Sequence, residues 1–256
     1  MGVFVDFYLS FYLVMGLVIL SGIEAQARVF NLPQEQFSSY LLVNGSSAPL
    51  ADSPWVLESA ATGTSKSYST VTGGEFGFIF TSRMIGWRFG FEIFKPAKLN
   101  DIEATQGGAT VYNVSSDMTG YAPKLGIEIT PWITPRQKAF LFGYVGTASL
   151  TLKNDYTSLT IAPNSDHTVE MTGTGSLTGG GVGYEIHFFD TTTFLLEAAY
   201  RTLKIDELTY SKAVTTFSSP GEGSVVPGQP VLKTDGTKRT IDFSGPYVTV
   251  GLRFWL

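Results

Sequence analysis

The chain has 256 residues, of which 43% are hydrophobic and 14% aromatic, whereas only 15% are charged. Soluble domains have about a quarter of their residues charged, and this apolar composition also argues against a disordered chain. The absence of cysteine excludes a disulfide scaffold and cysteine-ligated metal sites. With a formal net charge of −5, the sequence has no basic surface for nucleic acid. Its length permits one or two ordinary domains, or one large β-barrel.

The N-terminal region contains one long apolar run, at residues 3–23, which Asp6 interrupts. The small-x-small pattern Ala25-Gln26-Ala27 follows it, as at the site where a signal peptidase cuts. We therefore predict a signal peptide at residues 1–27 and a mature domain at residues 28–256. A single transmembrane helix is the alternative, because about 20 apolar residues suffice to span a bilayer.

The rest of the chain places apolar residues at every second position, which is the pattern of strands with one apolar face. Eight strands are predicted in chain order, at residues 37–44, 74–81, 86–94, 121–130, 138–152, 181–189, 194–205 and 247–256. Ten residues on the apolar faces are predicted to face lipid: Phe76, Phe78, Phe80, Trp87, Phe89, Phe91, Val248, Val250, Leu252 and Phe254.

The opposite faces of these strands mix glycine, hydroxyl groups and isolated charges, unlike a solvated surface rich in lysine. The strands reach the 9–11 residues or so that a tilted transmembrane strand needs. Because lipid cannot pair backbone groups, such strands must close on themselves. The pattern predicts an all-β fold, a membrane-spanning antiparallel up-and-down β-barrel of eight strands. A soluble β-sandwich, with the apolar faces turned inward, is the alternative.

The connections between the predicted strands alternate in length. Short ones are predicted at residues 82–85, 132–137 and 190–193, and long polar ones at residues 46–66, 97–118, 153–167 and 207–238. Barrels of the bacterial outer membrane keep short turns on the periplasmic side and long loops outside. We therefore expect a bacterial outer-membrane protein with both termini in the periplasm, in contact with outer-membrane lipids and lipopolysaccharide.

The run Gly74 to Thr81, a short turn and then Gly90 to Pro96 resembles the second and third strands of the OmpW family of outer-membrane barrels. Four further segments follow in the family's order: residues 123–132, 143–146, 181–184 and 251–254. The resemblance implies a barrel of a Gram-negative bacterium that passes small hydrophobic molecules through a narrow apolar lumen and a side opening.

The chain departs from the family at three places. The family ends on a terminal Phe, which forms part of the signal for the barrel assembly machinery, whereas Trp255 and Leu256 follow Phe254 here. Residues 28–36 before the first strand, and the long connection at residues 207–238, are also unusual for the family.

Side chains nearly fill the interior of an eight-stranded barrel, so an open aqueous pore is not expected. The expected inner faces carry nine charged residues of nearly balanced sign: Glu75, Arg88, Glu92, Lys124, Glu128, Glu185, Glu197, Arg201 and Arg253. An unpaired charge in a confined lumen is costly. The pattern predicts an ion-pair network that plugs the periplasmic half of the lumen. Its role is either purely structural or to divert a solute from the lumen into the membrane.

Leu203 and Ile205 continue the inner face beyond Arg201 towards the outer mouth, with Phe94 opposite. We interpret them either as an apolar access site for small hydrophobic solutes or as a surface on which a folded-in loop packs.

His187 beside Glu185 has poor spacing for a metal site. Adjacent residues such as Ser165, Asp166 and His167 rarely provide the geometry of a hydrolase triad. We expect no metal, no cofactor and no enzymatic activity.

Two functions follow from the sequence. The first is a porin-like outer-membrane channel for passive uptake of small hydrophobic molecules, with the charged network below it. The alternative is a non-transporting barrel that acts as a membrane anchor, or as a surface adhesin through its long loops. A barrel fold by itself does not decide between them.

Overall fold

A computed structural model describes residues 30–47, 62–63, 68–157, 166–216, 223–233 and 236–256. The predicted signal peptide, residues 1–27, lies outside the described residues, as do most of the predicted loop 46–66 and parts of the connections 153–167 and 207–238. Within the described part of the chain, no helix is both long enough and apolar enough to cross a membrane.

Eight long strands form the barrel: β1 (Phe37–Ser47), β3 (Thr70–Ser82), β4 (Ile85–Pro96), β6 (Ala109–Ile133), β7 (Gln137–Thr157), β8 (His167–Phe189), β9 (Thr192–Tyr210) and β13 (Gly245–Trp255). Smaller elements are the 3₁₀ turn η1 (Leu32–Gln34) and the strands β2 (Thr62–Gly63), β5 (Leu99–Gln106), β10 (Val214–Thr216), β11 (Gly223–Val225) and β12 (Ile241–Asp242).

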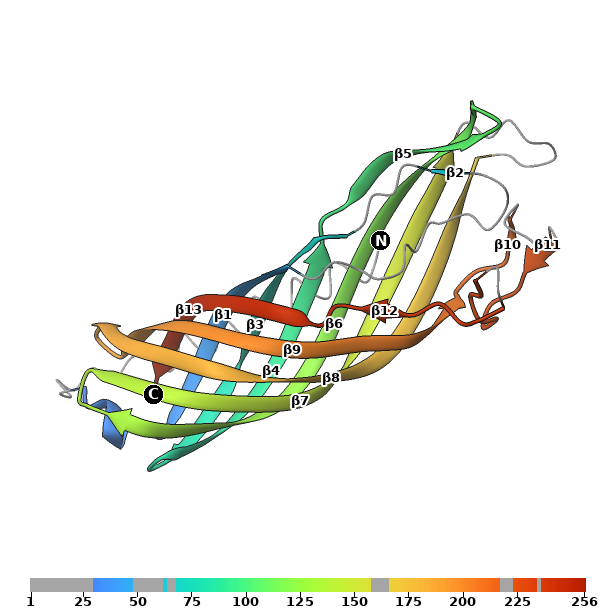
Figure 1. Ribbon diagram of the computed structural model, residues 1–256. Helices are drawn as coiled ribbons and strands as arrows, with labels where there is room; N and C mark the ends of the chain where they lie inside the picture. Colours follow the sequence, from blue (N-terminus) through green and yellow to red (C-terminus); the bar gives the residue numbers. More distant parts are fainter. Residues whose placement is uncertain (1–29, 48–61, 64–67, 158–165, 217–222, 234–235) are drawn as a thin grey trace.

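The eight long strands form a closed antiparallel ring in the order β1, β3, β4, β6, β7, β8, β9, β13, with β13 paired to β1 (Figure 1). This confirms the predicted all-β barrel and its eight strands. Three turns of two or three residues join β3 to β4, β6 to β7 and β8 to β9. Both chain ends of the barrel lie at this short-turn end, where the Leu256 N–H donates to the Phe37 carbonyl.

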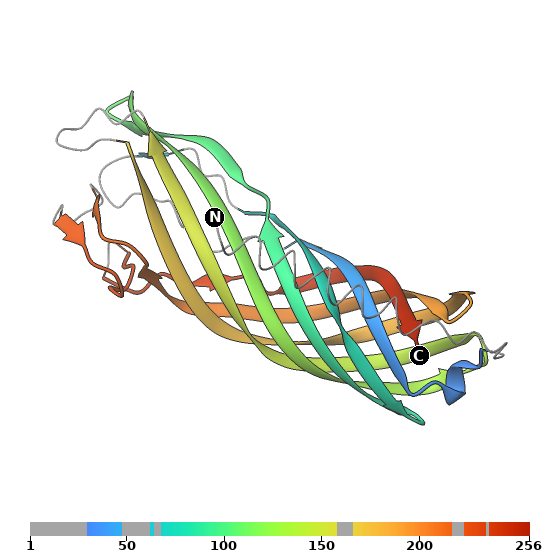
Figure 2. The same cartoon turned by 180° about the vertical axis from the view of Figure 1, so that it is seen from behind.

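The barrel has walls of unequal height (Figures 1 and 2). The strands β13, β1, β3 and β4 have 11 to 13 residues and form what we call the short wall. The strands β6, β7, β8 and β9 have 19 to 25 residues and form the tall wall. The lower half of the barrel is therefore a complete ring, whereas the upper half is a curved sheet.

The predicted loops at residues 97–118 and 153–167 are wrong in large part. Residues 99–106 form β5, residues 109–118 begin β6, and β7 continues to Thr157, with Asn113 paired to Thr157. The apolar face changes sides in these segments. On β7, Leu141 and Val145 point outward in the lower half, whereas Leu150 and Leu152 are buried on the inner face above. A prediction that expects the apolar residues of a strand to stay on one face throughout misses strands in which they move from the outer to the inner face.

Short strands protect the upper edges of the tall wall, which would otherwise expose unpaired backbone groups. β5 pairs with the upper part of β6, and β12 pairs with β9 through Ile241 and Ile205. The segment before β12 also runs along β9, because the Val231 N–H donates to the Leu208 carbonyl at 2.8 Å. The upper sheet thus ends in paired strands on both sides.

The lower half carries the apolar belt on its outer face. All ten residues predicted to face lipid point outward: Phe91, Leu252 and Phe254 are half-buried, and the other seven are exposed. Aromatic rings contact one another across this face, such as Phe37 with Phe80 at 4.7 Å and Phe91 with Tyr121 at 5.9 Å between ring centroids. Contact of the belt with lipid stays a prediction.

Glycine on β8 allows the close approach of neighbouring strands that the narrow ring requires. A Cβ atom at Gly181 would lie 2.2 Å from the Ala198 carbonyl oxygen, whereas one at Gly45 would meet no atom within 4 Å. We predict that Gly181→Ala lowers the free energy of unfolding by about 1–3 kcal/mol, because the backbone must shift. Gly45→Ala is the control and should leave it nearly unchanged. Denaturant unfolding in detergent measures both, and equal effects would contradict the packing argument.

Candidate functional site

The lumen of the lower half holds a buried network of charged side chains. All nine predicted residues lie on inner faces and are at most 8% exposed, and Lys138 on β7 joins them at 1%. The ten members are five carboxylates and five cations: Glu75, Glu92, Glu128, Glu185 and Glu197, with Arg88, Lys124, Lys138, Arg201 and Arg253. With Lys138 included, the formal charges of the network therefore sum to zero.

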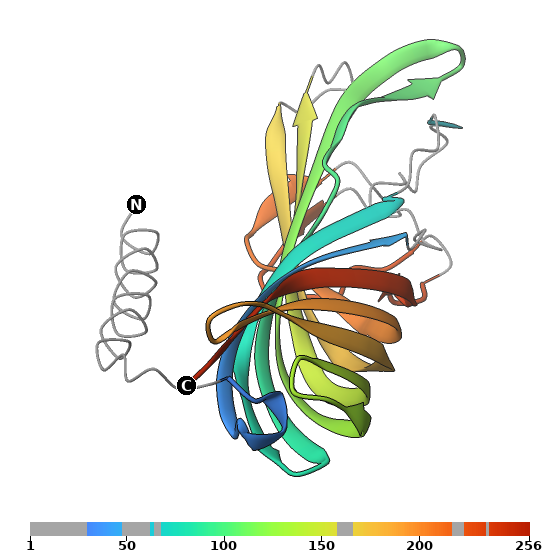
Figure 3. The same ribbon diagram turned by 90° about the vertical axis from the view of Figure 1, so that its left-hand side faces the viewer.

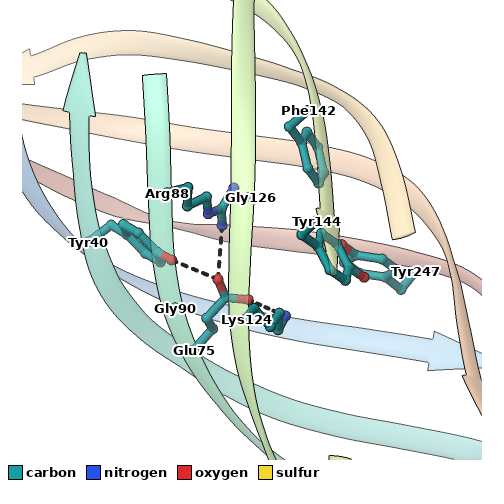
Figure 4. A pocket seen from close by; sticks show the side chains of 9 residues that line it. All are labelled: Tyr40, Glu75, Arg88, Gly90, Lys124, Gly126, Phe142, Tyr144 and Tyr247. Atoms are coloured by element: carbon teal, nitrogen blue, oxygen red, sulfur yellow. Dashed lines mark hydrogen bonds and ion pairs between the residues drawn. The ribbon is translucent and has the colours of Figure 1, made fainter. Parts of the chain in front are cut away.

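The upper part of the network links the tall wall to the short wall. Arg201 Nη1 lies 3.0 Å from Glu92, and Lys124 Nζ lies 2.7 Å from the other oxygen of that carboxylate. Lys124 also contacts Glu75 at 2.5 Å, and Glu75 contacts Arg88 Nη2 at 3.2 Å (Figure 4). Cations and carboxylates alternate along this series of contacts, so each charge here lies beside an opposite charge.

Arg88 connects the upper part to the lower part. Its Nη1 lies 2.6 Å from Glu197 and 3.7 Å from Glu128. Arg253 joins Glu128 at 2.6 Å to Glu185 at 2.7 Å. These residues come from β4, β6, β8, β9 and β13, so the network ties together strands on opposite sides of the ring.

Lys138 completes the lower part of the network, with Nζ at 3.1 Å from Glu185 and 3.5 Å from Glu128. Alternation in the sequence does not reveal it, because its neighbours on β7 are apolar on both faces, with Phe140 and Phe142 also buried in the lumen. An alternation argument assigns a strand's faces from a contrast between them. No such contrast exists at the start of β7.

Aromatic side chains surround the ion pairs, and sequence reasoning did not include them in the network. The Tyr40 O–H donates to Glu75 at 2.9 Å, and Trp255 Nε1 donates to Glu185 at 2.8 Å. Lys124 Nζ lies 4.8 Å from the centroid of the Tyr144 ring, a distance at which a cation is attracted to the ring face. These rings replace part of the hydration that the charges lose on burial.

A cavity lies between the ion pairs and the aromatic rings, lined by Glu75, Arg88 and Lys124 on one side and by Phe142, Tyr144 and Tyr247 on the other (Figure 4). Its volume of about 10 Å³ is room for a single water molecule. A cavity of this size does not provide a passage for solutes.

The upper half of the lumen has an apolar core. Phe94, Leu203 and Ile205, the predicted apolar access site, are each at most 1% exposed. They share a cluster with Ile241 and Phe243, which belong to the chain segment that returns from β9 to β13. The Phe94 and Phe243 rings meet edge to face at 6.2 Å. The segment that returns from β9 to β13 therefore packs on these three residues. Their use by a solute stays a prediction.

A buried polar chain crosses the upper core. The Tyr68 O–H donates to Ser116 Oγ at 2.7 Å, and Ser116 Oγ donates to Asn154 at 2.5 Å. Burial raises the pKa of the Tyr68 phenol, and the hydrogen bond with Ser116 opposes that rise. Tyr68 therefore stays a neutral hydrogen-bond donor and attaches the segment before β3 to β6 and β7.

The two histidines lie apart from the ion network. The His187 Nε2 atom is hydrogen-bonded to the Asp190 carbonyl at 2.7 Å, and its ring stacks on Phe30 at 4.7 Å. His167 stacks on Tyr156 at 5.3 Å, Asp166 is exposed, and Ser165 lies outside the described residues. Among the residues that the structure describes, no three His, Asp or Glu side chains form a group that could hold a metal ion.

No protein-family model matches the chain, and no curated protein matches it. Its fold is similar to that of three solved outer-membrane barrels. Ail, the attachment invasion locus protein of Yersinia pestis, is 11% identical with a TM-score of 0.46, covering 87% of this chain and 100% of its own. Neisserial surface protein A is 10% identical with a TM-score of 0.43, covering 87% and 100%. The outer membrane protein OprG of Pseudomonas aeruginosa is 11% identical with a TM-score of 0.43, covering 90% and 99%. Membership of the OmpW family stays a prediction.

The network makes Lys138 a test of charge pairing in the lumen. We predict that Lys138→Met lowers the free energy of unfolding by about 3–5 kcal/mol, because Glu128 and Glu185 would keep a buried, partly uncompensated charge. Lys153→Met is the matched control, because the Lys153 side chain is 50% exposed and pairs with Asp155 on the surface. It should cost less than about 1 kcal/mol. Denaturant unfolding in detergent compares the two, and similar costs would contradict the role of the network.

Proposed function

We propose that the protein is a closed outer-membrane barrel of a Gram-negative bacterium. It acts without catalysis, as a membrane anchor that holds the upper half of its own tall wall at the cell surface. Its apolar belt contacts the bilayer lipids, and the short turns and both termini lie in the periplasm. The upper half of the tall wall then stands outside the bilayer, next to lipopolysaccharide. The barrel assembly machinery inserts the chain, as it does other barrels of this membrane.

The observation that carries this proposal is a lumen filled along the described strands. The ion network occupies the lower half, where all eight strands are present, and the apolar cluster occupies the upper half. A solute that moved along the axis would have to separate ion pairs of 2.5 to 3.7 Å that have no bulk water around them. Breaking such a pair is costly because each charge would be left buried and uncompensated.

The height of the tall wall supports a role outside the membrane. β7 has 21 residues and β13 has 11, a difference of ten residues. At about 3.4 Å per residue, roughly 30 Å of β7 extends past the level of the complete ring. The outward residues of this part are polar, such as Thr147, Ser149, Thr151 and Lys153 on β7. A wall with a polar outer face and a filled inner face suits contact with the cell surface and its surroundings.

Conductance and uptake test the closed lumen. In planar bilayers we expect no steady ion conductance above that of the bare membrane. In liposomes we expect neither a small apolar fluorescent probe nor a sugar of similar size to enter faster than in empty vesicles. The protein must run as a folded, heat-modifiable barrel in both assays. Stable channels, or faster entry of either probe, would overturn the proposal.

Uptake of small hydrophobic molecules remains the second candidate, because an apolar site exists at the outer mouth. Phe94, Leu203 and Ile205 form one side of it, and Ile241 and Phe243 occupy it in the structure. Uptake then requires the segment that carries Ile241 and Phe243 to leave the site, so that the solute takes the place of these side chains. In this case the apolar probe, and not the sugar, enters the vesicles faster.

A disulfide distinguishes the two candidates, because the chain has no cysteine of its own. Ile205 and Ile241 are opposite residues of β9 and β12, so cysteines at both positions lie within the range that a disulfide spans. If uptake occurs through the outer mouth, this disulfide should abolish it, and a reductant should restore it. Cysteines at Asn113 and Thr157, an opposite pair on β6 and β7, are the control. Equal uptake with both disulfides would exclude this route.

A further inference from the structure

Residues 30–36 precede the first barrel strand and carry the turn η1 at the short-turn end. Figure 3 looks at this end of the molecule and shows η1 next to the ends of the strands. At one side the segment is fixed to the short wall, where the Thr81 N–H donates to the Gln36 carbonyl at 2.6 Å. At the other side the Leu32 N–H donates to the Pro135 carbonyl at 3.2 Å, in the turn between β6 and β7.

The two attachments lie on opposite sides of the ring. Starting from β1, the turn between β6 and β7 comes after β3 and β4 in one direction, and β8 comes after β13 and β9 in the other. Phe30 stacks on His187, near the end of β8, at 4.7 Å and 18° between the ring planes. A segment that begins at β1 and reaches both β8 and the turn before β7 crosses the mouth of the barrel.

The residues directly inside this mouth are dry although they lie at the ends of their strands. Lys138 is the second residue of β7, Thr193 the second of β9 and Trp255 the last of β13. Their exposed fractions are 1%, 0% and 1%. Side chains at the rim of an open barrel would contact water. Within the crossing segment, Leu32 is 2% exposed and Glu35 is 3% exposed, as expected for residues that cover the mouth.

Dry surroundings matter for the lower ion pairs, because water weakens the attraction between opposite charges. Lys138, Glu128, Glu185 and Arg253 form this lower cluster, and its members are at most 1% exposed. The far end of the crossing segment is held by one backbone bond to Pro135 and the ring stack on His187. The barrel strands are held by continuous ladders on either side, so the segment can separate while the ring stays closed.

We propose that residues 30–36 form a strap that closes the short-turn mouth and keeps the lower ion cluster dry. Release of the strap from Pro135 and His187 opens this mouth to water while the eight-stranded ring remains intact. Leu32 is the residue that holds the strap in place over the mouth.

Trp255 reports on this closure, because it lies in the mouth and its indole donates to Glu185. In the full-length chain, replacing Trp55, Trp87 and Trp132 by Phe leaves Trp255 as the single tryptophan. Quenching of its fluorescence by acrylamide, a neutral solute, then measures access to the mouth. We expect weak quenching with the strap intact. With Leu32→Asp in the same background, the quenching constant should rise severalfold towards that of a free tryptophan.

Gln34→Ala is the matched control, because Gln34 lies on the same turn with an exposed side chain and should leave the quenching unchanged. If Leu32→Asp does not fold, Phe30→Ala removes only the ring stack and should give a smaller rise. Circular dichroism and heat-dependent mobility on gels verify the folded barrel. Unchanged quenching in a folded Leu32→Asp or Phe30→Ala protein, or an equal rise in Gln34→Ala, would overturn the proposal.

Discussion

Charge pairing in the lumen is the constraint on which the rest of the lower barrel depends. An eight-stranded ring leaves its interior just wide enough for side chains, so ten ionisable groups there have little water. Glu92, Glu75, Glu197, Glu128 and Glu185 each contact at least one cation from a different strand. The same contacts that satisfy the charges fix the strands relative to one another. Removing one member leaves its neighbours buried with uncompensated charge, which couples distant parts of the ring.

The two halves of the barrel have opposite arrangements of polarity, and their surroundings explain this. In the lower half, side chains such as Phe78 and Val250 point outward and the charges point inward, as expected where the solvent is lipid. In the upper half, Leu150 and Leu177 are buried inside and hydroxyl groups lie outside, as expected where the solvent is water. One strand, β7, takes part in both arrangements. The change along β7 marks the upper limit of the apolar belt.

Closure at both ends comes from segments outside the eight strands. At the tall-wall end, Ile241 and Phe243 complete an apolar core that the tall wall alone would leave exposed to water. At the other mouth, the strap around Leu32 crosses from the short wall to Pro135. The strap lies within residues 28–36, and Ile241 and Phe243 come just after residues 207–238.

The sequence by itself determined the strands of the lower ring and, except on β1 and β7, the sides to which their residues point, because alternation of side chains has a fixed period of two. Nine network members follow from that period. Only the tertiary structure decided which charges meet, because Arg88 and Glu197 are 109 residues apart and on strands that are not neighbours. It also decided that Lys138 joins them, since its apolar neighbours conceal the inner face of β7. The upper strands and the folded-in segment also needed the structure. The apolar face of the upper strands is the inner one, and it packs against Ile241 and Phe243, which are distant from most of these strands in the sequence.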